Sequence, residues 1–222
     1  MWDKVWDKVF KENEWGKYPP EELIRFIARN YYSAPIRSEV KILEVGSGTG
    51  ANIWYMAREG FSVTGLDGSS IGVERARARL HREGLNAELV VGDAMRMRFM
   101  DGSFDCVVDN ECIYANSYAD SKKIIAEIFR VLKSGGMFFM KTFMIGTTGD
   151  GTGRRLEGEK NTYLEMTTGG LRQGSGIIRL TAEEEILDLC CGFKVESIDH
   201  VIRSDKNQMY EIKEWIVVCR KS

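Results

Sequence analysis

Acidic side chains stand at the ends of four apolar, strand-like runs of this sequence, at Glu44, Asp67, Asp93 and Asp109. A turn with glycine at every second position, residues 46–50, follows the first run. Carboxylates at strand ends accept hydrogen bonds from hydroxyl and amino groups, and a glycine turn lets a ligand approach the backbone closely. The pattern predicts a nucleotide-cofactor site in which Asp67 binds ribose hydroxyls and Asp93 binds an adenine amine.

The glycine turn by itself fits two kinds of cofactor. The pattern Gly46-x-Gly48-x-x-Ala51 satisfies the dinucleotide fingerprint, and Asp67 stands at a suitable distance for a ribose in either case. Glu44, however, occupies the place where a dinucleotide site faces pyrophosphate, and a carboxylate there suits a cofactor that carries a cation. The residues therefore favour a cationic nucleoside cofactor and leave a nicotinamide dinucleotide as the alternative.

Alternating helical and strand-like segments position these residues. We expect helices over residues 1–14, 21–32, 50–59, 69–83 and 119–132, and strands over residues 40–45, 61–66, 87–91, 104–109, 136–143, 193–201 and 213–219. A further helix is expected to open with Thr181 as N-cap and Glu184 at the capping-box spacing. This βαβ alternation indicates an α/β fold with a doubly wound, mostly parallel sheet and right-handed crossovers.

Composition excludes several classes of function. The 31 basic and 33 acidic side chains give a net charge of -2 without long runs of one sign, so we expect no nucleic-acid partner. The N-terminus lacks the apolar core of a signal peptide, and no run approaches the roughly 18 apolar residues of a membrane span. We therefore expect a cytoplasmic protein with no membrane partner. The sequence leaves its oligomeric state open.

Cysteine and histidine spacing predicts no metal site. The five cysteines form no Cys-x-x-Cys pair, and buried structural thiols are the simplest interpretation. His81 and His200 lie far apart without ligand-like neighbours.

Four motifs, in this order and spacing, resemble the class I S-adenosylmethionine-dependent methyltransferases: "EVGSGTG" at 44–50, "GLD" at 65–67, "VVGDAM" at 90–95 and "FDCVVDNECIY" at 104–114. The resemblance covers about residues 40–143, with a tail to 219. It implies a Rossmann-like, seven-stranded sheet whose last strand runs antiparallel between the fifth and sixth, and "KEWIVVCRK" is similar to that strand. It also implies S-adenosyl-L-methionine as cofactor and S-adenosyl-L-homocysteine as product.

The family pattern implies a set of cofactor contacts in this sequence. Carried over position by position, they are Glu44, Gly46, Ser47, Gly48, Asn52, Asp67, Gly68, Asp93, Ala94, Asp109 and Asn110. Asp109 and Asn110, at the mouth of the fourth strand, would also begin the acceptor pocket. Trp15 and Tyr18 either belong to a hydrophobic cap on the core or close over the cofactor, and we include both as candidate contacts.

The predicted function is transfer of a methyl group to an oxygen or nitrogen of a small-molecule acceptor. A hydroxyl acceptor benefits from a general base, for which Asp109 and His200, expected near a strand end, are the candidates. "DNEC" stands where methyltransferases of base amines and glutamine amides carry Asp/Asn-Pro-Pro-Tyr/Phe, which argues against those acceptors. A nicotinamide-dependent oxidoreductase and a non-catalytic S-adenosylmethionine-binding regulatory domain remain alternatives.

We expect one domain with four parts: a helical cap (1–35), a cofactor-binding core (36–143), an insertion (144–180), and a C-terminal helix and strand pair (181–222). The insertion is much longer than the roughly 2 to 6 residues usual between α/β elements, which suggests a functional segment. It combines nine glycines with apolar residues, and its arginines could select an acidic group: Arg154, Arg155, Arg172 and Arg179. We therefore interpret it as a mobile acceptor lid.

Overall fold

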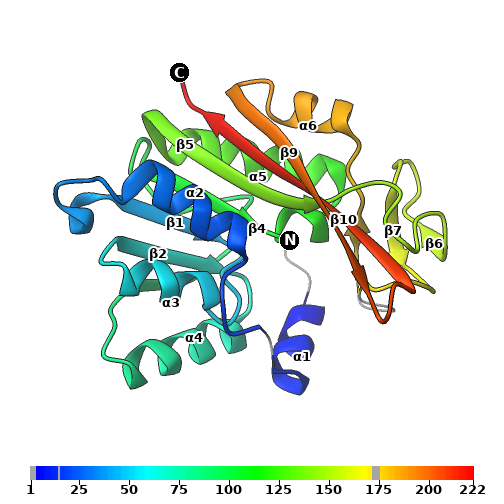
Figure 1. Ribbon diagram of the computed structural model, residues 1–222, viewed down its shortest axis with the longest axis horizontal. Coiled ribbons are helices and arrows are strands. Elements are labelled where there is room, and N and C mark those ends of the chain that lie inside the picture. Colours follow the sequence, from blue (N-terminus) through cyan, green and yellow to red (C-terminus); the bar gives the residue numbers. More distant parts are fainter. Residues whose placement is uncertain (1–3, 15, 172–175) are drawn as a thin grey trace.

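A seven-stranded sheet forms the centre of the computed structural model, which describes residues 4–14, 16–171 and 176–222 (Figure 1). Its strands are β1 (Lys41–Val45), β2 (Ser62–Asp67), β3 (Glu88–Val91), β4 (Phe104–Asn110), β5 (Leu132–Phe143), β9 (Lys194–Asp205) and β10 (Tyr210–Arg220). The strand order is β3-β2-β1-β4-β5-β10-β9. Strands β1 to β5 pair in parallel, and β10 runs antiparallel to both β5 and β9. The expected doubly wound sheet with an inserted antiparallel last strand is confirmed.

Helices cover both faces of this sheet (Figure 1). They are α1 (Val5–Glu12), α2 (Glu21–Tyr31), α3 (Ala51–Arg58), α4 (Ser70–Arg82), α5 (Tyr118–Val131) and α6 (Glu183–Leu189), with the short 3-10 helices η1 (Arg37–Glu39) and η2 (Ile113–Ala115). One apolar core lies between the sheet and α5 and α6, and a second lies between the sheet and α2 and α3. In the described part of the chain, no helix is both long and apolar enough to cross a membrane.

The two cores follow from the alternation of side chains along buried strands. In β4, Val107 packs into the core beneath α5, whereas Val108 packs into the core beneath α2. Because both faces of the strand are covered, the run is apolar almost throughout. The strand register then decides which face each polar residue near the strand end reaches.

The insertion contains a second sheet of three antiparallel strands: β6 (Arg154–Arg155), β7 (Thr162–Glu165) and β8 (Ile178–Arg179). Tyr163, Met166 and Ile178 are buried in an apolar cluster together with Tyr114 and Phe143 from the main domain. These strands are only two to four residues long and show no regular alternation of buried and exposed residues, so the sequence around them gives no clear strand signal.

The glycine-rich part of the insertion is hydrogen-bonded to the long β9–β10 hairpin, beside which the insertion lies in Figure 1. The amide of Thr148 donates to the carbonyl of Glu211 at 2.9 Å, and the amide of Glu211 donates to the Thr148 hydroxyl at 2.8 Å. The Thr147 hydroxyl bonds both the amide and the carbonyl of Lys213 at 3.1 Å. The insertion is therefore anchored at its glycine-rich end.

Several predicted boundaries were wrong, among them the start of β5, which lies four residues before the predicted position. The N-cap of α6 is Ala182, whose amide donates to the Glu185 carboxylate at 2.8 Å, so the predicted pair Thr181 and Glu184 is displaced by one residue. Thr181 instead extends the backbone pairing beyond β5, with its amide bonded to the Phe143 carbonyl. Strand β9 continues to Asp205, four residues beyond its predicted end, because β10 is equally long and pairs with it throughout.

Candidate active site

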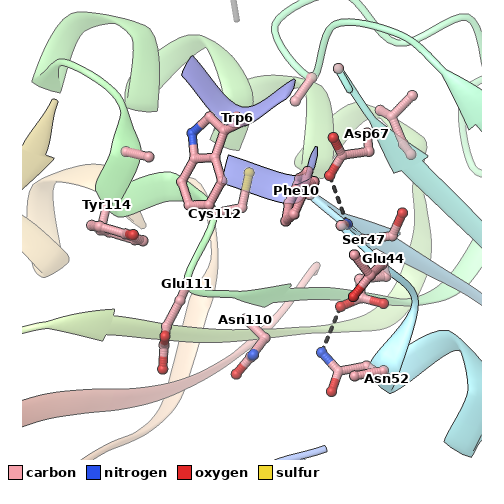
Figure 2. Close-up of a pocket in the computed structure, with 18 of the residues that line it drawn as sticks. Trp6, Phe10, Glu44, Ser47, Asn52, Asp67, Asn110, Glu111, Cys112 and Tyr114 are labelled. Carbon is pink, nitrogen blue, oxygen red and sulfur yellow. Dashed lines mark hydrogen bonds between the residues drawn. The ribbon is translucent and has the colours of Figure 1, made fainter. Parts of the chain in front are cut away.

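A pocket lies beyond the carboxyl ends of the parallel strands, where the strand order reverses between β1 and β4 (Figure 2). It spans about 1140 Å³ including its mouth. Among the residues predicted to bind the cofactor, those that line it are Tyr18, Glu44, Gly46, Ser47, Gly48, Asn52, Asp67, Gly68, Asp93, Ala94 and Asn110. Trp15 lies outside the described residues. Asp109 and His200 do not line the pocket in the described part of the chain.

Gly46 and Gly50 adopt left-handed backbone conformations, with φ of 70° and 82°. A Cβ atom at Gly46 would collide with the Cys112 side chain, and one at Gly50 would lie 2.7 Å from Ala76 Cβ. Glycine is therefore required both for the backbone angle and for close packing of the turn. The turn brings β1, the start of α3 and the residues after β4 into contact.

The amide groups of the glycine turn bond within the protein. Gly46 and Ser47 both donate to the Leu66 carbonyl, at 2.7 and 3.1 Å. Gly48 donates to the Asp67 carboxylate at 2.7 Å, and Gly50 donates to the Ser47 carbonyl at 2.9 Å. The amides of Gly46, Ser47 and Gly48 are thus engaged by strand β2 and its terminal carboxylate.

Glu44 and Asn52 form a buried polar pair on the pocket wall. The Asn52 side-chain amide donates to Glu44 Oε1 at 2.6 Å, as drawn in Figure 2. Glu44 is only 2% exposed, and burial raises its pKa to about 8, with the charges of Asp67 and Asp109 adding to the shift. The N-cap of α3 is Gly50, so Asn52 is held by Glu44 and does not cap the helix.

Several buried polar atoms of this pocket have no hydrogen-bond partner among the described residues. They are Glu44 Oε2, Asn52 Oδ1, Asn110 Oδ1 and the Ser47 hydroxyl. Three of the four are pure acceptors, and one belongs to a carboxylate. Because buried polar groups are almost always satisfied in folded proteins, this set points to a ligand that brings several N–H or O–H donors and a positive charge.

Asp67 has a double role at the end of β2. Its Oδ2 accepts from Gly48 and its Oδ1 accepts from the amide of Ser69, each at 2.7 Å. Burial raises the pKa of Asp67, whereas these two backbone hydrogen bonds oppose the rise. Each oxygen retains a further lone pair, so the side chain organises the turn and can still accept from a ligand hydroxyl.

Asp93 caps the turn that follows β3. Its Oδ1 accepts from the amide of Met95 at 3.0 Å, and its carbonyl accepts from Arg96 at 3.0 Å. The residue is half-buried and lines the pocket next to Ala94. The turn-forming role and the predicted adenine contact are compatible, because a carboxylate accepts several hydrogen bonds.

Sequence reasoning missed the aromatic side of the pocket, formed by Trp6, Phe10 and Tyr114. Figure 2 shows Trp6 and Phe10, both from α1, above Glu44 and Asn52 in this view, with Phe10 beside Asp67. The i, i+4 spacing of these two aromatics on an amphipathic helix was the available signal. This spacing indicated that one face of the helix is buried, but it did not indicate that this face packs over the pocket.

Cys112 and Glu111 were also missed, although both fall within the "DNEC" segment. Burial raises the pKa of the Cys112 thiol well above its usual value, and the carboxylates of Asp109, Asp67 and Glu44 add to the shift. Glu111 has a left-handed φ of 60°, and its carboxylate pairs with the buried Lys141 at 3.1 Å. Such a conformation is rare for residues other than glycine and is common near functional sites.

Asp109 does not reach the pocket because of the strand register. Val45 of β1 pairs with Asp109, whereas Glu44 pairs with Val108, so the side chains of Glu44 and Asp109 lie on opposite faces of the sheet. Asp109 is 0% exposed, its Oδ1 accepts from the amides of Cys112 and Ile113 at 2.9 and 3.0 Å, and burial raises its pKa to about 7. The structure does not support its prediction as cofactor contact and base.

His200 lies on β9, the edge strand of the sheet, opposite Trp215 of β10. It is exposed, and its ring centroid is 6.1 Å from that of Trp215. The prediction placed it near a strand end, but the extension of β9 puts it in the middle of the strand. The structure therefore does not bring this predicted base to the site.

The doubly wound sheet and the acidic pocket at its switch point define a nucleotide-cofactor-binding α/β domain. Residues 42–136 match a family model described as a methyltransferase domain. A sterol 24-C-methyltransferase of Gibberella zeae is 35% identical over 154 residues, which cover 68% of this chain and 38% of the relative. A fatty-acid O-methyltransferase of Mycolicibacterium smegmatis is 34% identical over 145 residues, which cover 60% of this chain and 52% of that protein.

A solved structure of an S-adenosylmethionine-dependent methyltransferase from Methanosarcina mazei shares the fold, with a TM-score of 0.67, 23% identity, and coverage of 88% of this chain and 96% of that one. The chain spans about half or less of the length of the two curated relatives above. It belongs to the class I S-adenosylmethionine-dependent methyltransferases, as its motifs predicted, and the cofactor of this family is S-adenosyl-L-methionine.

Proposed function

We propose that this protein transfers the methyl group of S-adenosylmethionine to a small, predominantly apolar acceptor. The observation that carries the proposal is the set of unpartnered acceptors on Glu44, Asn52 and Asn110 in one buried pocket. The cofactor has an ammonium group with several N–H donors and a cationic sulfonium, which match acceptor atoms and a carboxylate. Asp67, at the end of the neighbouring strand, is suited to the ribose hydroxyls.

The same pocket is poorly suited to a nicotinamide dinucleotide. A pyrophosphate requires free backbone amides and a favourable positive potential. Here the amides of Gly46, Ser47 and Gly48 are engaged by Leu66 and Asp67, and the buried carboxyl of Glu44 offers an anion no positive charge. These contacts disfavour the oxidoreductase alternative.

The protein's contribution to methyl transfer is mainly binding and orientation. S-adenosylmethionine supplies an activated methyl group on a sulfonium. Glu44, Asn52 and Asn110 would hold the amino-acid end of the cofactor, and Asp67 would hold its ribose. The α1 aromatics Trp6 and Phe10 exclude water from the same space, and fixed alignment of acceptor, methyl and sulfur can supply most of the rate acceleration.

The lining of the pocket favours an apolar acceptor. Trp6, Phe10, Tyr114, Ala115 and Ile124 provide apolar surface, and the described lining contains no Lys, Arg or His. A strongly anionic acceptor would therefore lack a counter-charge. The names of two relatives, a sterol methyltransferase and a fatty-acid methyltransferase, agree with an apolar acceptor. Oxygen and nitrogen remain our proposed acceptor atoms, with carbon as the third option because one relative is named a 24-C-methyltransferase.

Calorimetric titration with S-adenosylmethionine, S-adenosylhomocysteine and NAD tests the cofactor first. We expect binding of the first two and none of NAD. Formation of S-adenosylhomocysteine is then measured with a panel of long-chain fatty acids and sterols, and with sugars and phosphorylated metabolites as polar contrasts. Turnover confined to the polar compounds would contradict the apolar acceptor, and cofactor binding without any turnover would favour the regulatory-domain alternative.

The interpretation of the insertion as a mobile acceptor lid remains a hypothesis. The structure bears on where such a lid could act. No described residue of the insertion lines the pocket. The insertion packs instead against Tyr114, which does line it. We therefore propose that the described residues of the insertion pack behind Tyr114, on the side of the pocket where the acceptor would bind. They would influence acceptor choice through the position of Tyr114.

A further inference from the structure

Arg179, the last residue of β8, is completely buried, with 0% of its surface exposed. Within the described part of the chain, none of its three guanidinium nitrogens has a hydrogen-bond partner. The guanidinium carbon lies 5.5 Å from the centroid of the Tyr118 ring, and Nη1 lies 3.9 Å from Glu185 Oε2. Burial of an arginine is costly unless nearby charges and hydrogen bonds compensate it, so its position requires an explanation.

Three carboxylates supply the compensating charge. Burial lowers the pKa of Arg179, whereas the charges of Glu185, Glu159 and Asp109 raise it. The groups around Arg179 carry a net negative charge. This excludes the sequence-based prediction that Arg179 binds an acidic group of the acceptor. The guanidinium is a counter-ion inside the protein.

Each of these carboxylates also holds the backbone at the start of a helix. Glu159 accepts from the amide of Tyr118 at the start of α5, with 2.9 Å to each carboxylate oxygen. Glu185 accepts from Ala182 at the start of α6, and Asp109 accepts from the amides that lead into η2. Arg179 is therefore the shared cation of three helix starts, those of η2, α5 and α6.

The charge interaction with Asp109 is the one that connects Arg179 with the wall of the pocket. Asp109 Oδ1 is used by the amides of Cys112 and Ile113, whereas Oδ2 is buried and has no partner among the described residues. Strand β8 packs on η2, so the unpartnered oxygen and the unpartnered guanidinium belong to one buried region. Ordered water is the usual partner of such groups, and a bridging water would satisfy both of them.

We propose that Arg179 is a positioning residue for the acceptor side of the pocket. Paired with Asp109 through buried water, it holds the segment from Cys112 to Ala115, which lines the pocket, while Glu44 and Asp67 hold the cofactor independently. The name "acceptor side" rests on the proposed function, but the positioning itself can be tested without knowing the acceptor.

Cys112 provides the test, because its thiol reports the position of this segment. Cys106, Cys190 and Cys219 are buried and Cys191 is exposed, so the experiment uses a Cys191→Ser background. Labelling by iodoacetamide is followed by peptide mass spectrometry, together with affinity for S-adenosylhomocysteine. We expect Arg179→Met to label Cys112 about tenfold faster or more, because local opening exposes the thiol.

Faster labelling of Cys112 would distinguish movement of the segment from the electrostatic effect of losing the Arg179 charge. Loss of a positive charge raises the pKa of a nearby thiol and slows labelling, so faster labelling requires movement of the segment. Arg179→Lys, which keeps the charge, should restore most of the protection. Arg154→Met, an exposed arginine of the same insertion, is the matched control and should leave labelling unchanged.

Unchanged Cys112 labelling in a folded Arg179→Met protein would overturn the proposal. If that variant does not fold, Asp109→Asn is compared with the parent, and normal Cys112 labelling in this variant would likewise overturn the proposal. Failure of the parent protein to bind S-adenosylhomocysteine would contradict the proposed function and leave the labelling result valid. Equal loss of ligand affinity and thiol protection in Arg179→Met would contradict the independence of the two sides.

Discussion

The carboxylate of Glu44 is bound on one oxygen by Asn52 at 2.6 Å, and its other oxygen is buried without a partner among the described residues. Half of this side chain is thus satisfied by the fold and half is left for a ligand. Since the polar pair lies where β1 ends and α3 begins, a cationic ligand at this point would touch both elements. Because a nearby cation lowers the pKa of a carboxyl group, binding of the cofactor beside Glu44 should be linked to release of a proton.

Cofactor binding should release a proton from Glu44. In the free protein the pKa of Glu44 is raised to about 8, and a bound cation must lower it. Below pH 8, affinity for S-adenosylhomocysteine should therefore rise with pH, by up to about tenfold per unit, and level off as Glu44 becomes ionised. Calorimetry in buffers of different ionisation enthalpy measures the released protons directly, and Glu44→Gln is the control that should release fewer. Equal proton release by both proteins would contradict this assignment.

Glu44→Gln should stabilise the free protein at alkaline pH. The folded pKa of about 8 lies above the unfolded value of 4.5, so ionisation of Glu44 opposes folding increasingly as pH rises between those values. The substituted amide keeps an oxygen for Asn52 without the charge. We expect a gain on the order of 2–4 kcal/mol in the free energy of unfolding at pH 9, disappearing near pH 4. Urea denaturation at both pH values measures it, and a gain that does not depend on pH would argue against a charge effect.

Gly46→Ala should be strongly destabilising, by about 2–5 kcal/mol, because left-handed backbone strain is combined with a collision against Cys112. Gly84→Ala is the matched control, since Gly84 has a similar φ of 65° but no atom within 4 Å of an added Cβ. That control should lose only about 1–2 kcal/mol. The second substitution Cys112→Gly should recover part of the loss at Gly46. Denaturant titration of the four proteins would show whether the collision matters.

Cleavage of the insertion by a protease should not depend on ligand. The Tyr163 hydroxyl donates to Asp150 at 2.5 Å and accepts from the amide of Gly151 at 2.8 Å, which holds the glycine-rich part in place. Tyr163→Phe removes both bonds and should expose residues 147–153 to limited proteolysis, whereas Tyr210→Phe should not. Protection of the parent protein that appears only when cofactor and acceptor are both present would instead favour the mobile lid.

His200→Ala should leave turnover and cofactor affinity within about twofold of the parent, as expected for an exposed residue away from the site. The measurement is S-adenosylhomocysteine formation on an acceptor that supports turnover, with Glu44→Gln as the impaired comparison. A large loss of kcat with unchanged folding would restore His200 as a base and require movement of β9.

The strand ends that line the pocket could be predicted from the sequence because the information that marks them is local. Glu44, Asp67 and Asp93 each follow an apolar run, and the glycine turn stands directly after the first. Parallel strands deliver their carboxyl ends to one edge of the sheet, so their order along the chain predicts a shared pocket. Hydrophobic periodicity was sufficient to predict a doubly wound, mostly parallel sheet, and the family resemblance supplied the inserted last strand.

The tertiary structure alone decided which side chains reach that pocket from elsewhere. Asp109 is excluded by strand register, since pairing of Val45 with Asp109 turns its carboxylate to the face opposite Glu44. Trp6 and Phe10 enter through the docking of α1, and Arg179 becomes a buried counter-ion only when β8 packs against η2. Register, docking and burial depend on contacts between residues far apart in the chain, whereas propensity and spacing report only on neighbours. For that reason the sequence determined which strand ends line the pocket. The tertiary structure determined the aromatic residues that line it and the buried charges around Arg179.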